Sequence, residues 1–273
     1  MREDSVRDNQ VPARQLGDAI RMPTLGLGVW QMAEGRETEQ AIEWAFEAGY
    51  RHIDTATIYR NERSVGAAVA RSGLSRQEIF ITTKWPPFRL SPATELARSL
   101  ERLQLEFVDL YLIHWPVPLR ATRAWTELER LRERGAARAI GVSNYGSDAL
   151  DRLAASASVK PAVNQVQFSP FHFRRRLLAA CGRNDVVLEA YSPLDRGRRL
   201  SHPAIVEIAQ RLERTPAQVM LRWALQHNAV VIPKSSQAER IRSNAQIFEF
   251  ELGTHDMNTL DALDQTDGTG RAR

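Results

Sequence analysis

The chain has 273 residues, of which 43% are hydrophobic, and a formal net charge of +4. Its longest apolar runs, such as 108-VDLYLI-113, are too short to span a bilayer, and the first ten residues, MREDSVRDNQ, lack the apolar core of a signal peptide. The single cysteine, Cys181, excludes an intrachain disulfide and disfavours a cysteine-built metal site, so we expect a cytoplasmic protein.

The basic residues do not indicate a nucleic-acid partner. They alternate with acidic residues along predicted helices, as in 127-ELERLRERG-135, a pattern typical of a solvated helix face. Of the 37 basic residues, only Lys84, Lys160 and Lys234 are lysines. Because arginine supplies nearly all the positive charge, each lysine is a candidate for a specific role.

Short β-rich runs alternate with amphipathic helical segments along the chain. Helical patterns are clearest at 37–49, 92–104 and 147–157. Four successive strands end at Asp54, Lys84, His114 and Ser143, spaced by 30, 30 and 29 residues, which is the length of one βα unit. The predicted strands are, in chain order, 24–28, 52–54, 79–84, 108–114, 139–143, 162–165, 186–190 and 229–233.

Eight strands that alternate with helices predict a (β/α)8 TIM barrel, formed as a single domain over residues 1–273. The competing fold is an open doubly wound sheet, which usually carries a glycine-rich phosphate-binding turn after its first strand. Here 26-GLG-28 lacks the third glycine of that turn, which favours the barrel. Residues 1–23, with a turn at 16–19, are expected to form a β-hairpin that plugs the lower end of the barrel.

Nearly every predicted strand ends on a polar or ionisable side chain. One polar strand end is more often structural than functional, because strand ends are wet. In a barrel, however, the carboxyl ends of all strands open on one face, so this many polar ends indicate an active site there. The residues are Asp54, Lys84, His114, Ser143, Asn144, Gln165, Tyr191 and Lys234.

Four of these groups can meet. Neighbouring strands are ~5 Å apart, so Asp54, Lys84 and His114 can lie together, and Tyr59 can return to them from the loop after the second strand. A phenol with a pKa near ~10 is a weak acid at neutral pH, but a nearby cation favours its ionisation and makes it a better proton donor. With His114 hydrogen-bonding the same oxygen, this set suits protonation of a carbonyl oxygen while a hydride reaches its carbon.

Longer motifs surround these residues, in the order GYRHIDTATIYRNE (49–62), TTKW, DLYLIHWP, AIGVSN, PAVNQ, YSPL and VIPKS. From about Met22 to Asp264 the chain resembles the aldo-keto reductase family, most of all its bacterial 2,5-diketo-D-gluconate reductase type. The resemblance implies a hydride donor, NADPH, bound without a Rossmann domain. It makes Tyr59 the general acid/base, in a tetrad with Asp54, Lys84 and His114.

The resemblance also implies how the cofactor is held. Ser143, Asn144 and Gln165 correspond to groups that hold the nicotinamide carboxamide, and Tyr191, in the YSPL motif with Ser192 and Leu194, to the aromatic ring on which nicotinamide stacks. Lys234, Ser235 and Arg240 correspond to groups that grip the adenosine 2′-phosphate, and Asn244 lies near the adenine. Charge-assisted bonds to a phosphate dianion should favour NADPH over NADH.

Three tryptophans, Trp30, Trp85 and Trp115, follow strand ends and are expected to line the substrate mouth, although large aromatics are more often core residues. Asp195 stands where the family commonly has glycine, in the loop expected to cross the cofactor pyrophosphate, so we expect it to affect cofactor affinity. The segment after His114 is short, which predicts an open, permissive site for small carbonyl substrates.

Two other classes of function compete with an NADPH-dependent reductase of aldehydes and ketones. A regulatory or redox-sensing module could bind NADPH with little turnover, but the intact tetrad argues against it. A metal-dependent hydrolase could use Asp54 and His114, but the six histidines are scattered, with no HxH pair, so no metal is expected. The resemblance implies a monomer without a membrane partner. The residue pattern leaves the natural substrate, the product stereochemistry and the physiological direction open.

Overall fold

The computed structural model describes residues 11–17, 20–88, 90–117 and 121–266. Its main sheet is an 8-stranded parallel sheet in which each strand pairs with the next along the chain. The strands are β3 (Leu27–Gly28), β4 (His52–Asp54), β5 (Phe80–Trp85), β6 (Val108–Ile113), β7 (Ala137–Ser143), β8 (Val163–Gln167), β9 (Val187–Tyr191) and β10 (Val230–Ile232).

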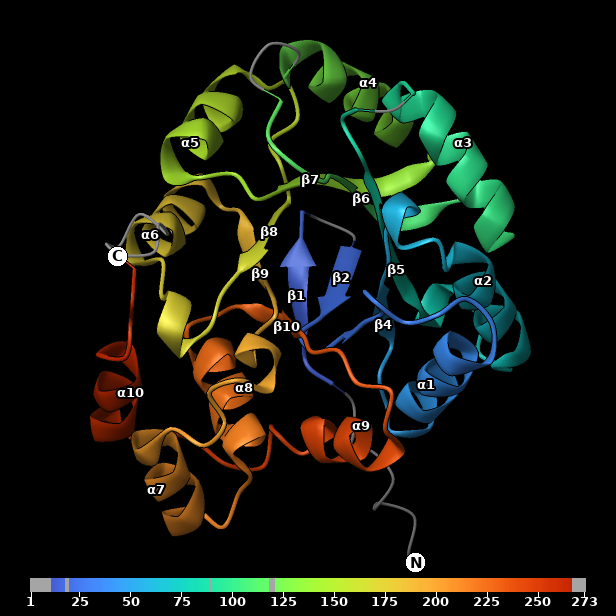
Figure 1. Cartoon of the computed structure of the whole chain (residues 1–273). Helices are drawn as coiled ribbons and strands as arrows, with labels where there is room; N and C mark the ends of the chain where they lie inside the picture. The colour runs from blue at the N-terminus through green and yellow to red at the C-terminus, as the bar shows by residue number, and fades with distance from the viewer. Residues whose placement is uncertain (1–10, 18–19, 89, 118–120, 267–273) are drawn as a thin grey trace, which may run out of the picture.

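The sheet closes on itself next to β3. Leu25 forms a parallel bridge with Val231, and the Gly26 amide donates a hydrogen bond to the Val231 carbonyl at 2.9 Å. The first strand therefore joins the last, and helices surround the resulting barrel (Figure 1). This architecture confirms the predicted (β/α)8 barrel and all eight predicted strands.

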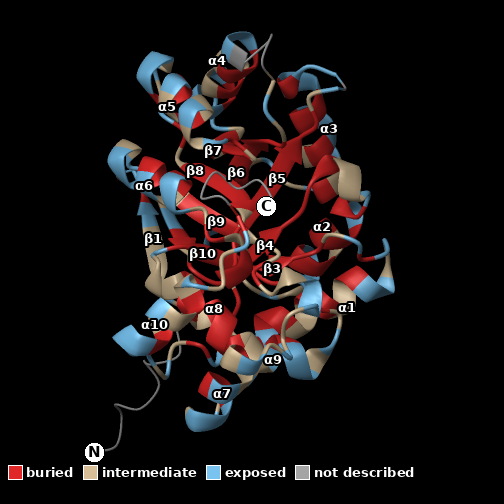
Figure 2. Ribbon diagram, turned by 60° about the vertical axis from the view of Figure 1, so that its left-hand side comes forward, coloured by how far each residue is buried: buried red, intermediate tan, exposed pale blue. Residues whose placement is uncertain are grey.

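The helices cover the barrel from outside, with their outward faces exposed and the strands buried (Figure 2). The predicted helices at 37–49, 92–104 and 147–157 correspond to α1 (Arg36–Glu47), α3 (Pro92–Leu103) and α5 (Ser147–Ser156). The helices are α1 (Arg36–Glu47), α2 (Glu62–Arg71), α3 (Pro92–Leu103), α4 (Ala121–Glu133), α5 (Ser147–Ser156), α6 (Arg175–Asn184), α7 (Pro203–Arg211), α8 (Pro216–Gln226), α9 (Ala238–Ala245) and α10 (Thr254–Asp261).

Local sequence signals explain where these helices begin. Helix α8 starts with a capping box. The Thr215 hydroxyl accepts a hydrogen bond from the backbone N–H of Gln218, and the Gln218 side-chain oxygen accepts one from the backbone N–H of Thr215. Pro216 at its first turn has no amide to leave unpaired. Of the described helices, none is long and apolar enough to cross a membrane.

An antiparallel hairpin, β1 (Ala13–Leu16) and β2 (Ile20–Pro23), lies at the centre of the ring of strands (Figure 1). Its Leu16 and Met22 share a buried cluster with residues such as Phe80 and Val230, which begin their strands. The hairpin therefore closes the amino-terminal end of the barrel, as predicted, while residues 1–10 of the predicted segment lie outside the described residues. In the predicted turn, Gly17 has a left-handed φ of 60°, whereas Asp18 and Ala19 lie outside the described residues.

Candidate active site

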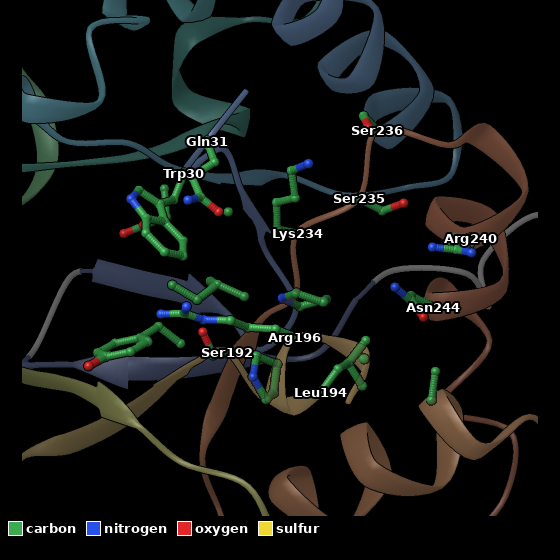
Figure 3. Close-up of a pocket in the computed structure, with 18 of the residues that line it drawn as sticks. Trp30, Gln31, Ser192, Leu194, Arg196, Lys234, Ser235, Ser236, Arg240 and Asn244 are labelled. Atoms are coloured by element: carbon green, nitrogen blue, oxygen red, sulfur yellow. The ribbon is translucent and has the colours of Figure 1, made fainter. Parts of the chain in front are cut away.

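A cavity of about 910 Å³ opens where the strands end. It runs from the floor formed by Asp54 and Tyr59 to the segment between β10 and α9, which contributes Lys234 and Ser235. Figure 3 shows Trp30 and Arg196 on one side of this cavity, with Arg240 and Asn244 on the other. This volume is in the range of cavities that bind cofactors and small molecules.

The four tetrad residues gather at the floor of the cavity. The Lys84 ammonium, at the end of β5, is fully buried and uses its three N–H groups within the protein. Its Nζ atom donates to Asp54 Oδ1 at 2.6 Å, to the Thr55 carbonyl at 2.9 Å and to Tyr59 Oη at 3.3 Å. His114 lies next to Tyr59, with 5.8 Å between the ring centroids in an edge-to-face arrangement.

The charge states follow from this packing. Burial alone would lower the pKa of Lys84, but Asp54 and Tyr59 raise it above its usual value, so the side chain stays an ammonium. Burial raises the pKa of Asp54, and the Lys84 charge opposes that rise. Burial also raises the pKa of Tyr59. The Lys84 charge lowers the pKa of Tyr59, as we expected, but by less than burial raises it. Tyr59 is therefore a neutral phenol, with its proton available.

His114 is a neutral imidazole at the cavity wall. Burial, aided by the Lys84 charge, lowers its pKa to about 2. Its ring stacks on that of Trp115 with 3.9 Å between centroids, and its Nδ1 atom has no hydrogen-bond partner in the described part of the chain. A neutral imidazole can donate one hydrogen bond without giving up a proton, which suits orientation of a substrate oxygen.

The residues expected to hold the nicotinamide carboxamide form one connected group in the cavity wall. The Asn144 amide donates to the His114 carbonyl at 3.0 Å, and its oxygen accepts from the Tyr191 hydroxyl at 2.9 Å. Ser143 donates to the Gln165 backbone carbonyl at 2.8 Å. Asn144 has a left-handed φ of 62°, a conformation that asparagine adopts more readily than most residues. The loop after β9 places Ser192 and Leu194 on the same cavity.

The end of the cavity next to α9 carries two cationic side chains and the acidic Glu239. Lys234 and Arg240 line it, and neither forms an ion pair with any described residue. Ser235 accepts a hydrogen bond from the Gln237 amide at 3.2 Å, just before α9, and Asn244 reaches the cavity from the last turn of that helix. Two free cations next to a helix amino terminus provide the chemistry that binds a phosphate.

The three tryptophans divide between the cavity and the core. Trp30 and Trp115 line the cavity, as predicted. Trp85 was expected beside them, but it does not line the cavity; its side chain is buried and its indole N–H donates to the Leu90 carbonyl at 2.7 Å. Because β5 continues through Trp85, its side chain points to the opposite face of the strand from Lys84.

Comparison with known proteins decides the family. The family model described as "Aldo/keto reductase family" matches residues 24–265. The chain belongs to the aldo/keto reductase family. It is 44% identical over 259 residues to the glyoxal reductase of Bacillus subtilis, covering 94% of each chain, and 43% identical over 258 residues to a methylglyoxal reductase of Yersinia pestis, covering 93% of each. The structure of a Bombyx mori aldo-keto reductase in complex with NADP matches with a TM-score of 0.87, at 31% identity over 93% of each chain.

The family assignment from the sequence motifs is thus confirmed. The finer assignment, to the 2,5-diketo-D-gluconate reductase type, stays a prediction, as does the single domain over the full 273 residues. Of the residues that the structure describes, no group of three or more His, Cys, Asp or Glu side chains is placed to hold a metal ion.

Two charged residues that are not among the predicted site residues lie at or beside the cavity of this aldo-keto reductase. Arg196 lines the cavity with its guanidinium 4.8 Å from the centre of the Trp30 ring. Glu189 lies fully buried in β9, two residues before Tyr191 and so on the same face of the strand. A carboxylate in the predicted strand VVLEA was the available signal for Glu189, because such a group needs a partner when buried.

Asp195 was expected beside the cofactor pyrophosphate, but its side chain pairs with a neighbouring arginine. It is not among the described residues that line the cavity, and its carboxylate lies 3.7 Å from the Arg199 guanidinium. Its backbone adopts a left-handed φ of 47°, which costs a non-glycine residue roughly 1–2 kcal/mol.

Asp195→Gly should therefore raise the free energy of unfolding by about 1 kcal/mol, measured by urea denaturation. Its effect on cofactor affinity should be small, because Arg199 already faces the carboxylate. A several-fold tighter NADPH dissociation constant, measured by fluorescence titration, would instead show that Asp195 opposes cofactor binding.

Proposed function

We propose that this aldo-keto reductase reduces the carbonyl groups of aldehydes and ketones to alcohols, with NADPH as cofactor. The observation that carries the proposal is the buried Lys84–Asp54 pair that contacts the Tyr59 hydroxyl at the floor of the cavity. The glyoxal and methylglyoxal reductases among its relatives, and the NADP complex of its Bombyx mori structural neighbour, support the same chemistry.

The residues of the cavity fit a nicotinamide cofactor. Lys234 and Arg240, which pair with no acid among the described residues, offer two cations for the 2′-phosphate. Ser143, Asn144 and Gln165 offer amide and hydroxyl groups for the carboxamide, which needs both donors and acceptors. Tyr191 offers a ring beside them. The bound cofactor would supply the hydride; everything else in the reaction is left to the protein.

The protein supplies the proton for the reduction. Tyr59, neutral at physiological pH, donates its proton to the carbonyl oxygen, and the phenolate that remains lies beside the Lys84 ammonium. Asp54 holds Lys84 in place at 2.6 Å. The neutral His114 hydrogen-bonds the same oxygen and orients the substrate, with Trp30 and Trp115 bounding the space around it.

Cofactor preference can be tested at the positive end of the cavity. Lys234→Ala combined with Arg240→Ala should raise the dissociation constant for NADPH by at least about 10-fold, because charge-assisted hydrogen bonds contribute about 1.5–3 kcal/mol each. The constant for NADH should change far less. Arg242→Ala is a matched control, since Arg242 lies on the same helix but pairs with Glu47 at 3.3 Å. Equal losses for both cofactors would rule out the 2′-phosphate assignment.

The function itself is tested by titrating the protein with NADPH and then following cofactor oxidation with glyoxal, methylglyoxal, other α-dicarbonyls and keto-sugars. Turnover is the expected result, and the best substrate defines the class. NADPH binding without turnover on any member of the panel would favour the alternative, a regulatory module. We also propose a cytoplasmic location, in line with the buried, unpaired thiol of Cys181, and a monomer, which rests on the family resemblance alone.

A further inference from the structure

The barrel interior holds a carboxyl group that the proposed proton transfer does not use. Glu189, on β9, is fully buried, and its Oε2 atom accepts a hydrogen bond from Gln165 Nε2 at 2.9 Å. The same Gln165 nitrogen donates to Asp54 Oδ2 at 2.7 Å. Because both amide hydrogens of Gln165 point at carboxyl oxygens, the orientation of this amide is fixed, and its oxygen is the atom left for the cofactor.

The charges around Glu189 do not balance if it is ionised. Glu189 faces Asp54 and His52 on β4 and Gln165 on β8. The cation that acts on its charge is Lys84 on β5. Its neighbour on β10 is the apolar Val230. One ammonium cannot neutralise two buried carboxylates, and burial lowers the pKa of His52 to about 3, so its imidazole is uncharged. Burial and the Asp54 charge raise the pKa of Glu189 to about 8.

The position of the Glu189 proton follows from its contacts. Oε2 accepts the Gln165 hydrogen bond, so a proton on this side chain belongs to Oε1. That atom has no hydrogen-bond partner within the described residues, and it lies 3.5 Å from His52 Nε2. A neutral imidazole nitrogen can accept one hydrogen bond there, and the Thr82 hydroxyl, 3.2 Å from the same nitrogen, is the competing donor. A neutral Glu189 therefore has an acceptor for its proton at His52 and a donor for its other oxygen at Gln165.

We propose that Glu189 is a positioning residue for the reduction: as a neutral acid it holds the Gln165 amide against Asp54, and its ionisation weakens the reaction. The inference rests on the proposed function. An ionised Glu189 would accept more strongly from its own Gln165 hydrogen and so pull the amide away from Asp54. It would also draw on the Lys84 charge, which must stabilise the Tyr59 phenolate as the proton leaves.

Glu189→Gln is the decisive variant, because a glutamine amide copies the shape and hydrogen bonds of the neutral acid and cannot ionise. We would measure kcat/KM for reduction from about pH 6 to about pH 9.5 in the wild type, Glu189→Gln and Glu189→Ala. The wild-type value should fall as pH rises through about 8. Glu189→Gln should stay within about 3-fold of the wild type at the acid end and lose this fall, while Glu189→Ala should be slower by at least about 10-fold at every pH.

Two results would overturn the inference: a Glu189→Gln profile with the same alkaline fall as the wild type, or a Glu189→Gln rate as low as that of Glu189→Ala. Infrared difference spectroscopy gives a readout that needs no turnover. The wild type should show a protonated carboxyl band at neutral pH that disappears at alkaline pH, and Glu189→Gln should lack this band. A wild type without the band at neutral pH would refute the neutral acid. If the wild type reduces no carbonyl in the panel, the proposed function itself is contradicted, whereas the infrared band still tests the neutral Glu189.

Discussion

Replacing Tyr59 by phenylalanine should lower kcat for carbonyl reduction by about 10²–10⁴-fold, the range expected for loss of a general acid. The substitution removes one oxygen atom and the proton that it carries. It leaves the ring in its edge-to-face contact with His114 and leaves Lys84 bonded to Asp54 and the Thr55 carbonyl. Steady-state kinetics with the best aldehyde of the panel gives the measurement.

Cofactor binding is the control for this variant. The NADPH dissociation constant of Tyr59→Phe should stay close to the wild-type value, because Lys234 and Arg240 come from the segment after β10 and from α9, which the substitution leaves unchanged. Turnover that survives in Tyr59→Phe would show that another group supplies the proton. Lost cofactor affinity would point instead to a general disturbance of the cavity.

Replacing Lys84 by methionine should affect stability and activity together. The substitution leaves Asp54 as an unpaired buried carboxylate, and breaking a buried ion pair in this way costs about 3–5 kcal/mol. It also removes the cation beside the Tyr59 hydroxyl, so kcat should fall by on the order of 10²-fold. Urea denaturation and kinetics measure the two effects.

The double variant Lys84→Met with Asp54→Asn separates them. Asparagine has nearly the shape of aspartate and no charge, so the double variant should recover part of the lost stability. It should not recover turnover, because the cation is still missing. Turnover restored along with stability would mean that Lys84 acts on the reaction only by keeping the barrel folded.

The barrel was predictable because its regularity is local. Each βα unit repeats the same pattern of apolar strand, polar strand end and amphipathic helix. The β-rich runs and their regular spacing therefore placed the strand ends at Asp54, Lys84 and His114, within one residue of the ends in the structure. The contacts among them then follow from the parallel arrangement of β4, β5 and β6.

Two things could not be predicted from the sequence: which face of a strand a side chain occupies, and which residues distant in the sequence contact it. Trp85 was expected in the substrate mouth because it follows the predicted end of a strand, but β5 continues through it and turns its side chain to the face opposite Lys84. Glu189 and Asp54 lie far apart in the sequence, and only closure of the barrel brings both to the Gln165 amide. The orientation of a loop residue such as Arg196 depends on its contact with Trp30, which no local pattern reveals.

The seam between Leu25 and Val231 has a consequence for how the chain folds. The first barrel strand pairs with the last, so a nascent chain cannot close the barrel until almost all of it has left the ribosome. Until then Leu16 and Met22 of the hairpin lack part of the cluster that buries them. Contacts this distant in sequence slow folding, and a chain truncated before β10 would expose two open sheet edges, which are prone to pair with other chains.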